Sequence, residues 1–108
     1  MTKFASIQEI PKDWLYEYFK KSKDNFLTGS YLLLDDKKGF MTFDFDEKYF
    51  YIHCVYGDGE YWYKLSREIA KKLNLNKIRF ATQRNYKAFE RKYKAKLIGY
   101  VLEFDVDE

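Results

Sequence analysis

The chain has 108 residues, of which 46% are hydrophobic and 21% aromatic, and its formal net charge is +3. This length suits one domain, so residues 1–108 are expected to share a single core. A single cysteine excludes an internal disulfide, and with only one histidine beside it no metal site is expected. No apolar run reaches the roughly 18 residues needed to cross a membrane, and a reducing, cytoplasmic location is the simplest expectation.

The N-terminal half predicts one helix followed by three strands. Apolar residues at helical spacing behind Pro11 predict an amphipathic helix over about 11–22. Short apolar or alternating runs separated by polar turns then predict strands at 30–34, 40–45 and 49–55. Because two tight turns join these three strands, they should form an antiparallel meander.

The pattern changes period at Glu60, where helical spacing begins, and either Asn74 or Asn76 can end this second helix. A short strand is expected at 77–82. A strand, a helix and another strand in succession predict a right-handed crossover whose two strands lie parallel.

Asn85 can cap a third helix, and the last strand is expected at about 97–106. The predicted fold class is therefore α/β (α+β), with a mixed, mostly antiparallel twisted sheet and flanking helices. The predicted element order is α-β-β-β-α-β-α-β.

The turn Tyr56-Gly57-Asp58-Gly59-Glu60 separates the third strand from the second helix. Glycines allow the backbone to approach a ligand closely, and a helix N-terminus presents free N–H groups and partial positive charge. Together they predict a pyrophosphate site. A plain turn explains the same residues, and Asp58 and Glu60 add negative charge where a phosphate would bind.

Over about residues 30–105, this order of elements resembles the GCN5-related N-acetyltransferase (GNAT) family. In that family a loop of the form Q/R-x-x-G-x-G/A holds the CoA pyrophosphate, and a later helix often contains N-x-x-A. Gly57 and Gly59 match the loop glycines, and Asn85 and Ala88 match the helix, whereas Cys54 stands where Gln or Arg is expected. The resemblance implies a small GNAT-like domain that uses acetyl-CoA. The implied cofactor-binding residues are Val55, Tyr56, Gly57, Asp58, Gly59 and Asn85.

In the family, the substrate amine attacks the thioester while a base takes its proton and a tyrosine can protonate the leaving thiolate. His53 is the only side chain whose ordinary pKa lies near neutrality, so it is the candidate base. Tyr93 is the candidate acid, although it also completes the apolar stripe of the third helix. A histidine held by hydrogen bonds on a sheet face is the structural alternative for His53.

Strand alternation places His53 on one face with Tyr49, Tyr51 and Val55, and Cys54 on the opposite face as a core residue. Arg84 follows the fourth predicted strand, where ligands of open sheets gather, and is a candidate for binding substrate or phosphate. A solvated loop position explains Arg84 equally well.

Twelve of the basic residues lie between positions 64 and 96, which indicates either an anionic partner or the solvated faces of two helices. Three functions remain open. The first is acetyl transfer from acetyl-CoA to a small amine or a protein amine. The second is a catalytically inactive fold that binds a protein partner, of the sort that a phage or mobile element encodes. The third is nucleic-acid binding through the basic half. An open gap between the strands predicted at 49–55 and 77–82 would favour the first.

Overall fold

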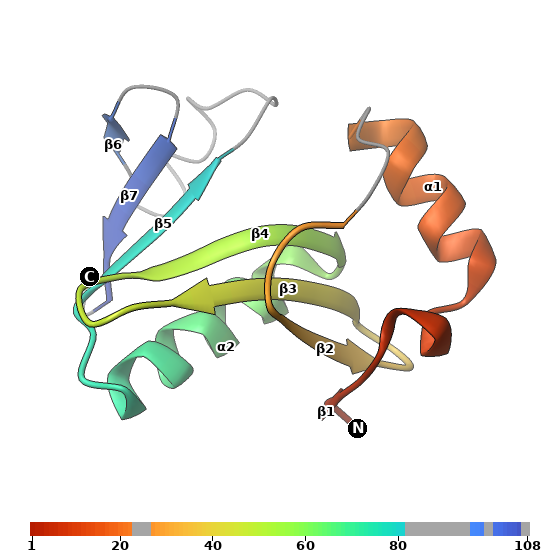
Figure 1. Ribbon diagram of the computed structural model, residues 1–108, viewed down its shortest axis with the longest axis horizontal. Helices are drawn as coiled ribbons and strands as arrows, with labels where there is room; N and C mark the ends of the chain where they lie inside the picture. Colours follow the sequence, from red (N-terminus) through yellow and green to blue (C-terminus); the bar gives the residue numbers. More distant parts are fainter. Residues whose placement is uncertain (23–26, 82–95, 99–100, 107–108) are drawn as a thin grey trace.

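The structure is a computed structural model that describes residues 1–22, 27–81, 96–98 and 101–106 (Figure 1). Within these ranges the backbone forms a sheet of seven strands, one 3-10 helix and two α-helices. Their bounds in chain order are β1 Lys3–Phe4, η1 Ile7–Glu9, α1 Lys12–Ser22, β2 Tyr31–Asp35, β3 Gly39–Phe45, β4 Phe50–Gly57, α2 Gly59–Lys72, β5 Lys77–Ala81, β6 Lys96–Ile98 and β7 Val101–Asp105.

The strands lie in the order β1-β2-β3-β4-β5-β7-β6. Strands β2, β3 and β4 form the predicted antiparallel meander, and β5 runs parallel to β4 on the far side of the α2 crossover. Strand β7 returns antiparallel to β5. The predicted class, a mixed and mostly antiparallel sheet with flanking helices, is confirmed for this part of the chain.

Two predictions about the ends of the sheet are wrong. Strand β1 was not expected, although it pairs with β2 through Lys3 and Phe4. The single strand predicted at 97–106 is instead the antiparallel pair β6 and β7, in which Ile98 lies opposite Val101. The mostly apolar stretch 97–102 fits one long strand or two short ones, and Gly99 is the only glycine in it. The helix predicted from Asn85 lies outside the described residues.

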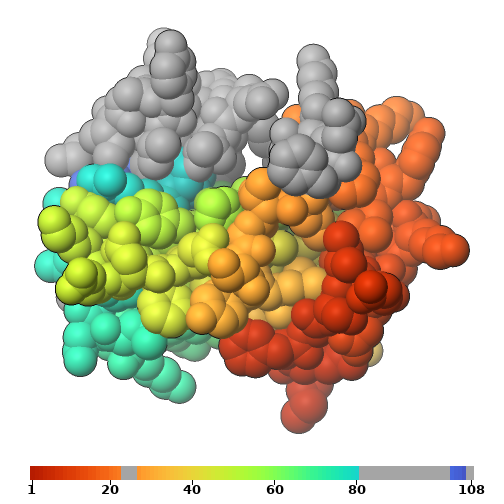
Figure 2. Space-filling view, viewed as in Figure 1, coloured from red at the N-terminus to blue at the C-terminus, as the bar shows by residue number. Residues whose placement is uncertain are grey.

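The two helices cover opposite faces of the sheet, because neighbouring residues of β3 belong to different apolar clusters. Met41, which is fully buried, belongs to the same cluster as Trp62 on α2. Phe40, which is also fully buried, belongs to the other cluster together with Tyr18 on α1. In the space-filling view the N-terminal residues, drawn in red, lie against the outer side of the meander (Figure 2). Alternation with period two in β3 therefore divides its side chains between two cores.

Strand β4 contains a β-bulge at His53. Thr42 pairs with Cys54 and the next β3 residue, Phe43, pairs with Ile52, so His53 is the extra residue on β4. A bulge shifts the alternation of every residue beyond it. Val55 consequently packs with the α2 cluster, as Ile52 does, while Cys54 packs with the α1 cluster.

The bulge overturns two sequence-based assignments. Val55 does not share a face with His53, because it packs into the α2 core. Cys54 is not on the face opposite His53: both side chains reach the hydroxyl of Thr28, at 3.3 Å from His53 Nδ1 and 3.9 Å from Cys54 Sγ. The prediction that Cys54 belongs to the core is confirmed, since it is 3% exposed.

Candidate functional site

The parallel pairing of β4 with β5 ends at the bulge. Register partners run from Phe50 and Ile78 to Ile52 and Phe80, and β4 then continues to Gly57 with register partners only on β3 among the described strands. Bulges bend a strand and increase its twist. Figure 1 shows the result: β5 turns away from β4 beyond their common end. The backbones of the described parts of β4 and β5 therefore separate from His53 onward, and we call this separation the opening.

At the start of this opening, His53 bridges two polar side chains from other segments. Its Nε2 lies 2.9 Å from Oδ2 of Asp44 on β3, and its Nδ1 lies 3.3 Å from Oγ1 of Thr28, which precedes β2. The second carboxylate oxygen of Asp44 accepts a hydrogen bond from the backbone N–H of Ser30 at 3.0 Å. The carboxylate is thus held from one side and holds the imidazole on the other.

These partners define how neutral His53 carries its proton. A carboxylate only accepts hydrogen bonds, so Nε2 carries the hydrogen toward Asp44 and Nδ1 accepts one from the Thr28 hydroxyl. The side chains of His53 and Asp44 are 34% and 32% exposed, so solutes reach them. A carboxylate thus fixes the orientation of the imidazole, and Nδ1 faces the Thr28 hydroxyl.

A buried hydroxyl lies beneath this group. Thr42 is 3% exposed, and its Oγ1 has no hydrogen-bond partner among the described residues. Gly29 has a φ of +108°, and a Cβ atom at that position would lie 3.0 Å from Cβ of Thr42. A side chain at position 29 would be strained in this conformation and would press on Thr42, so glycine is needed for the segment before β2 to pass close over β3.

The predicted pyrophosphate turn has a different structural basis at each of its two glycines. Gly57 has a φ of +96°, and a Cβ there would lie only 2.3 Å from the carbonyl oxygen of Lys38. Gly57 is therefore required by the close approach of two turns. Gly59 has no such constraint, since a Cβ there would have its closest contact at 3.9 Å from Cε2 of Tyr63. The fold itself does not explain a glycine at position 59.

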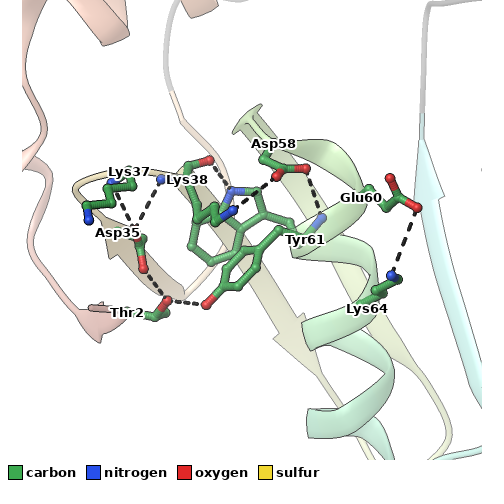
Figure 3. A network of polar contacts seen from close by, with 9 residues as sticks. Thr2, Asp35, Lys37, Lys38, Asp58, Glu60, Tyr61 and Lys64 are labelled. Atoms are coloured by element: carbon green, nitrogen blue, oxygen red, sulfur yellow. Dashed lines mark hydrogen bonds and ion pairs between the residues drawn. The ribbon is translucent and has the colours of Figure 1, made fainter.

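The side chain of Asp58 caps the N-terminus of α2 (Figure 3). Oδ1 of Asp58 accepts a hydrogen bond from the backbone N–H of Tyr61 at 3.1 Å, and this bond holds the pKa of the Asp58 carboxyl below its usual value. Oδ2 of Asp58 lies 3.5 Å from Nζ of Lys38. A carboxylate thus lies where the sequence predicted a bound pyrophosphate.

Further contacts fix the β2–β3 turn against α2. The Lys38 carbonyl accepts hydrogen bonds from the backbone N–H of Asp58 and from Nε1 of Trp62, both at 2.9 Å. Asp35 accepts a hydrogen bond from Thr2, whose hydroxyl also contacts the Tyr61 hydroxyl (Figure 3). This turn is consequently a structural joint between the meander and the crossover helix.

The remaining predicted cofactor residues on β4 serve the two cores. Tyr56 stacks on Phe40 with ring centroids 5.4 Å apart, and its hydroxyl donates to Oε2 of Glu17 at 2.6 Å. That hydrogen bond, aided by burial, raises the pKa of Tyr56 to about 12. Val55 is half-buried against the α2 cluster. Three of the predicted site residues, Arg84, Asn85 and Tyr93, lie outside the described residues.

Thr28, Ser30 and Asp44 were missed by sequence reasoning. Thr28 and His53 are 25 residues apart, and no local spacing relates them. Strand register was the missing information. Asp44 pairs with Tyr51, so it lies on the face that Tyr51 and His53 share, and the segment before β2 brings Thr28 to His53.

A shallow pocket of about 560 Å³ lies at the opposite end of β4 and β5, away from His53. Its lining residues are Glu47, Lys48, Tyr49, Lys71, Asn74, Leu75, Asn76 and Lys77. In the described part of the chain, no group of three or more His, Cys, Asp or Glu side chains is arranged to hold a metal ion. None of the described helices has the length and apolar character needed to span a membrane.

No family model, curated protein or solved structure matches this chain.

Proposed function

We propose that the chain binds acetyl-CoA along the opening between β4 and β5 and transfers the acetyl group to an amine, with His53 as general base. The observation that carries this proposal is the coincidence of two features. The β4–β5 pairing ends at the bulge, and the bulge residue is a histidine oriented by Asp44. The GNAT-like order of elements supports the same proposal.

The opening suits an extended ligand that carries amide groups. Residues 53–57 of β4 have register partners on β3 alone among the described strands, so within the described part of the chain no strand pairs with their other edge. Such an edge binds an added strand through main-chain hydrogen bonds. The pantetheine arm of CoA is extended and contains two amides, and it would bind in this way with its thioester near the bulge.

His53 supplies the proton acceptor that amine acylation needs. The amine loses a proton as it attacks the thioester carbonyl, and Nδ1 of His53 accepts it, either directly or through the Thr28 hydroxyl. General-base catalysis of this kind contributes on the order of 10²–10⁴ in rate. Replacing His53 by glutamine should therefore slow transfer by about that factor without abolishing acetyl-CoA binding.

The Asp58 cap favours a second candidate, a fold retained for binding a protein partner without catalysis. The carboxylate already accepts the hydrogen bond from the N–H of Tyr61, and it would repel a pyrophosphate at the same helix end. Under the first proposal, acetyl-CoA would have to bind mainly through its pantetheine arm and only weakly through its phosphates. The nucleic-acid alternative rests on a basic segment of which residues 82–95 lie outside the described chain.

Thermal unfolding with and without acetyl-CoA tests the proposal. A ligand at about 100 times its dissociation constant adds ~2.7 kcal/mol, which raises the midpoint of a domain this size by on the order of 10 °C. Gly59→Leu is the matched variant, because a Cβ at position 59 has its closest contact at 3.9 Å, and it should fold normally yet reduce the shift. ADP serves as the control for binding of the nucleotide alone. A folded protein that shows no shift at millimolar acetyl-CoA would sink the proposal and leave the protein-binding candidate.

A further inference from the structure

Asp44, His53 and Thr28 form a chain of carboxylate, imidazole and hydroxyl. The two contacts are 2.9 Å between Asp44 Oδ2 and His53 Nε2 and 3.3 Å between His53 Nδ1 and Thr28 Oγ1. A nucleophile within hydrogen-bond reach of a base, with the base oriented by a third group, is the arrangement that activates hydroxyl nucleophiles in acyl transfer. Each member comes from a different segment, so the bulged sheet assembles the group.

The orientation of the imidazole makes Thr28 the residue that is activated. Because Asp44 accepts the hydrogen on Nε2, the free electron pair is on Nδ1, which faces the Thr28 hydroxyl. Thr28 is exposed. The thiol of Cys54, which lies 3.9 Å from the Thr28 hydroxyl, belongs to a residue that is only 3% exposed.

We propose that Thr28 accepts an acyl group covalently from activated esters and thioesters. Oγ1 of Thr28 forms a bond to the acyl carbonyl carbon while its proton passes to Nδ1 of His53. The bond from that carbon to the leaving oxygen or sulfur breaks, and the leaving group takes that proton from His53, or it departs as an anion while His53 releases the proton to solvent. Water, deprotonated by the same nitrogen, then hydrolyses the Thr28 ester and restores the free hydroxyl.

This inference goes beyond the proposed function, because it requires an activated acyl group and no CoA site. Acylation of Thr28 would make the chain an esterase or thioesterase, or a carrier that passes the acyl group to the amine in a second step. Asp44 acts here as a positioning residue, since it contacts only the imidazole and the Ser30 backbone.

The test is an acid-quenched reaction of the whole chain with p-nitrophenyl acetate, followed by intact-mass measurement and peptide mapping. The expected result is one acetyl group on Thr28. Thr28→Val removes the hydroxyl at nearly constant shape and should remove this adduct, while Thr28→Ser should keep it. His53→Gln should slow its formation by on the order of 10²-fold, and Asp44→Asn by at least about tenfold, with partial recovery in Asp44→Glu.

Circular dichroism of each variant, compared with the wild type, establishes that the fold persists. Acetyl groups found only on Cys54 or on lysines, or equal labelling in Thr28→Val, would overturn the inference. A parallel reaction with acetyl-CoA separates it from the proposed function. Stabilisation by acetyl-CoA without an adduct on Thr28 from either reagent refutes the inference alone. An adduct from p-nitrophenyl acetate without any acetyl-CoA binding supports the inference while the proposed function fails.

Discussion

Replacing Gly57 by alanine should destabilise the chain severely, whereas Gly59→Ala should not. The two glycines flank a single residue, and the sequence alone does not distinguish their roles. In the structure, a Cβ on Gly57 would lie 2.3 Å from the Lys38 carbonyl oxygen and 3.0 Å from Cα of Gly39, at a φ of +96°. A Cβ on Gly59 would meet only Cε2 of Tyr63, at the ordinary contact distance of 3.9 Å.

The cost at position 57 has two parts. A side chain held at this positive φ costs about 1–3 kcal/mol. The Lys38 carbonyl must also move, which weakens its hydrogen bonds from the Asp58 N–H and Trp62 Nε1. Each of these contributes a net ~0.5–1.5 kcal/mol. The total is roughly 2–6 kcal/mol, a large share of the ~5–15 kcal/mol by which domains are stable, and the midpoint should fall by at least about 10 °C.

Thermal and urea unfolding followed by circular dichroism measure both variants. Gly59→Ala is the matched control, and its stability should change by no more than about 1 kcal/mol, with an increase expected from the smaller entropy of the unfolded chain. If Gly57→Ala unfolds together with Gly59→Ala, the close approach of the two turns is not what requires glycine at position 57. Lys38→Ala, which keeps the backbone carbonyl, should leave the difference between the two variants intact.

Three further results are expected. Hydrogen bonds from the Lys37 backbone N–H and then from the Thr2 hydroxyl lower the pKa of Asp35 to about 2. The stability that the Asp35 carboxylate contributes is therefore present above pH ~4 and is lost as pH falls toward 2. Asp35→Asn should reduce this loss of stability in acid, as measured by urea unfolding. Because the pKa of Tyr56 is raised to about 12, the stability that the protonated Tyr56 hydroxyl contributes is lost as pH rises from ~10 to 12. Glu17→Gln should lower that pKa in an ultraviolet titration. Trp62→Phe removes a fully buried indole and its bond to the Lys38 carbonyl, and calorimetry should register a loss of about 1–4 kcal/mol.

The described helices and strands from α1 to β5 could be predicted because they depend on local patterns. Apolar spacing behind Pro11 predicted a helix over 11–22, and α1 spans Lys12–Ser22. Alternation and two polar turns predicted the meander, and the change of period at Glu60 predicted α2, whose end is marked by Asn74 at a φ of +59°. The parallel pairing of β4 and β5 followed from the crossover rule.

The bulge could not be predicted, because it is a property of how two strands pair. Residues 49–55 contain no glycine or proline to signal an interruption, so strand periodicity put His53 with Val55 and opposite Cys54. Only the register of β4 against β3 inserts the extra residue. A one-residue shift moves every following side chain to the other face, which is why a single misjudged position changed the assignment of several.

The sequence by itself thus determined the helices, the meander and the crossover, since the hydrophobic period and the turn residues are local properties of the chain. Tertiary structure decided what the notable residues do. It made Gly57 a packing requirement of the Lys38 turn, turned Asp58 into the cap of α2, and joined His53 to Asp44 and Thr28 across three segments. Contacts between distant segments depend on strand register and on the close approach of turns, and neither is encoded at fixed spacing along the chain.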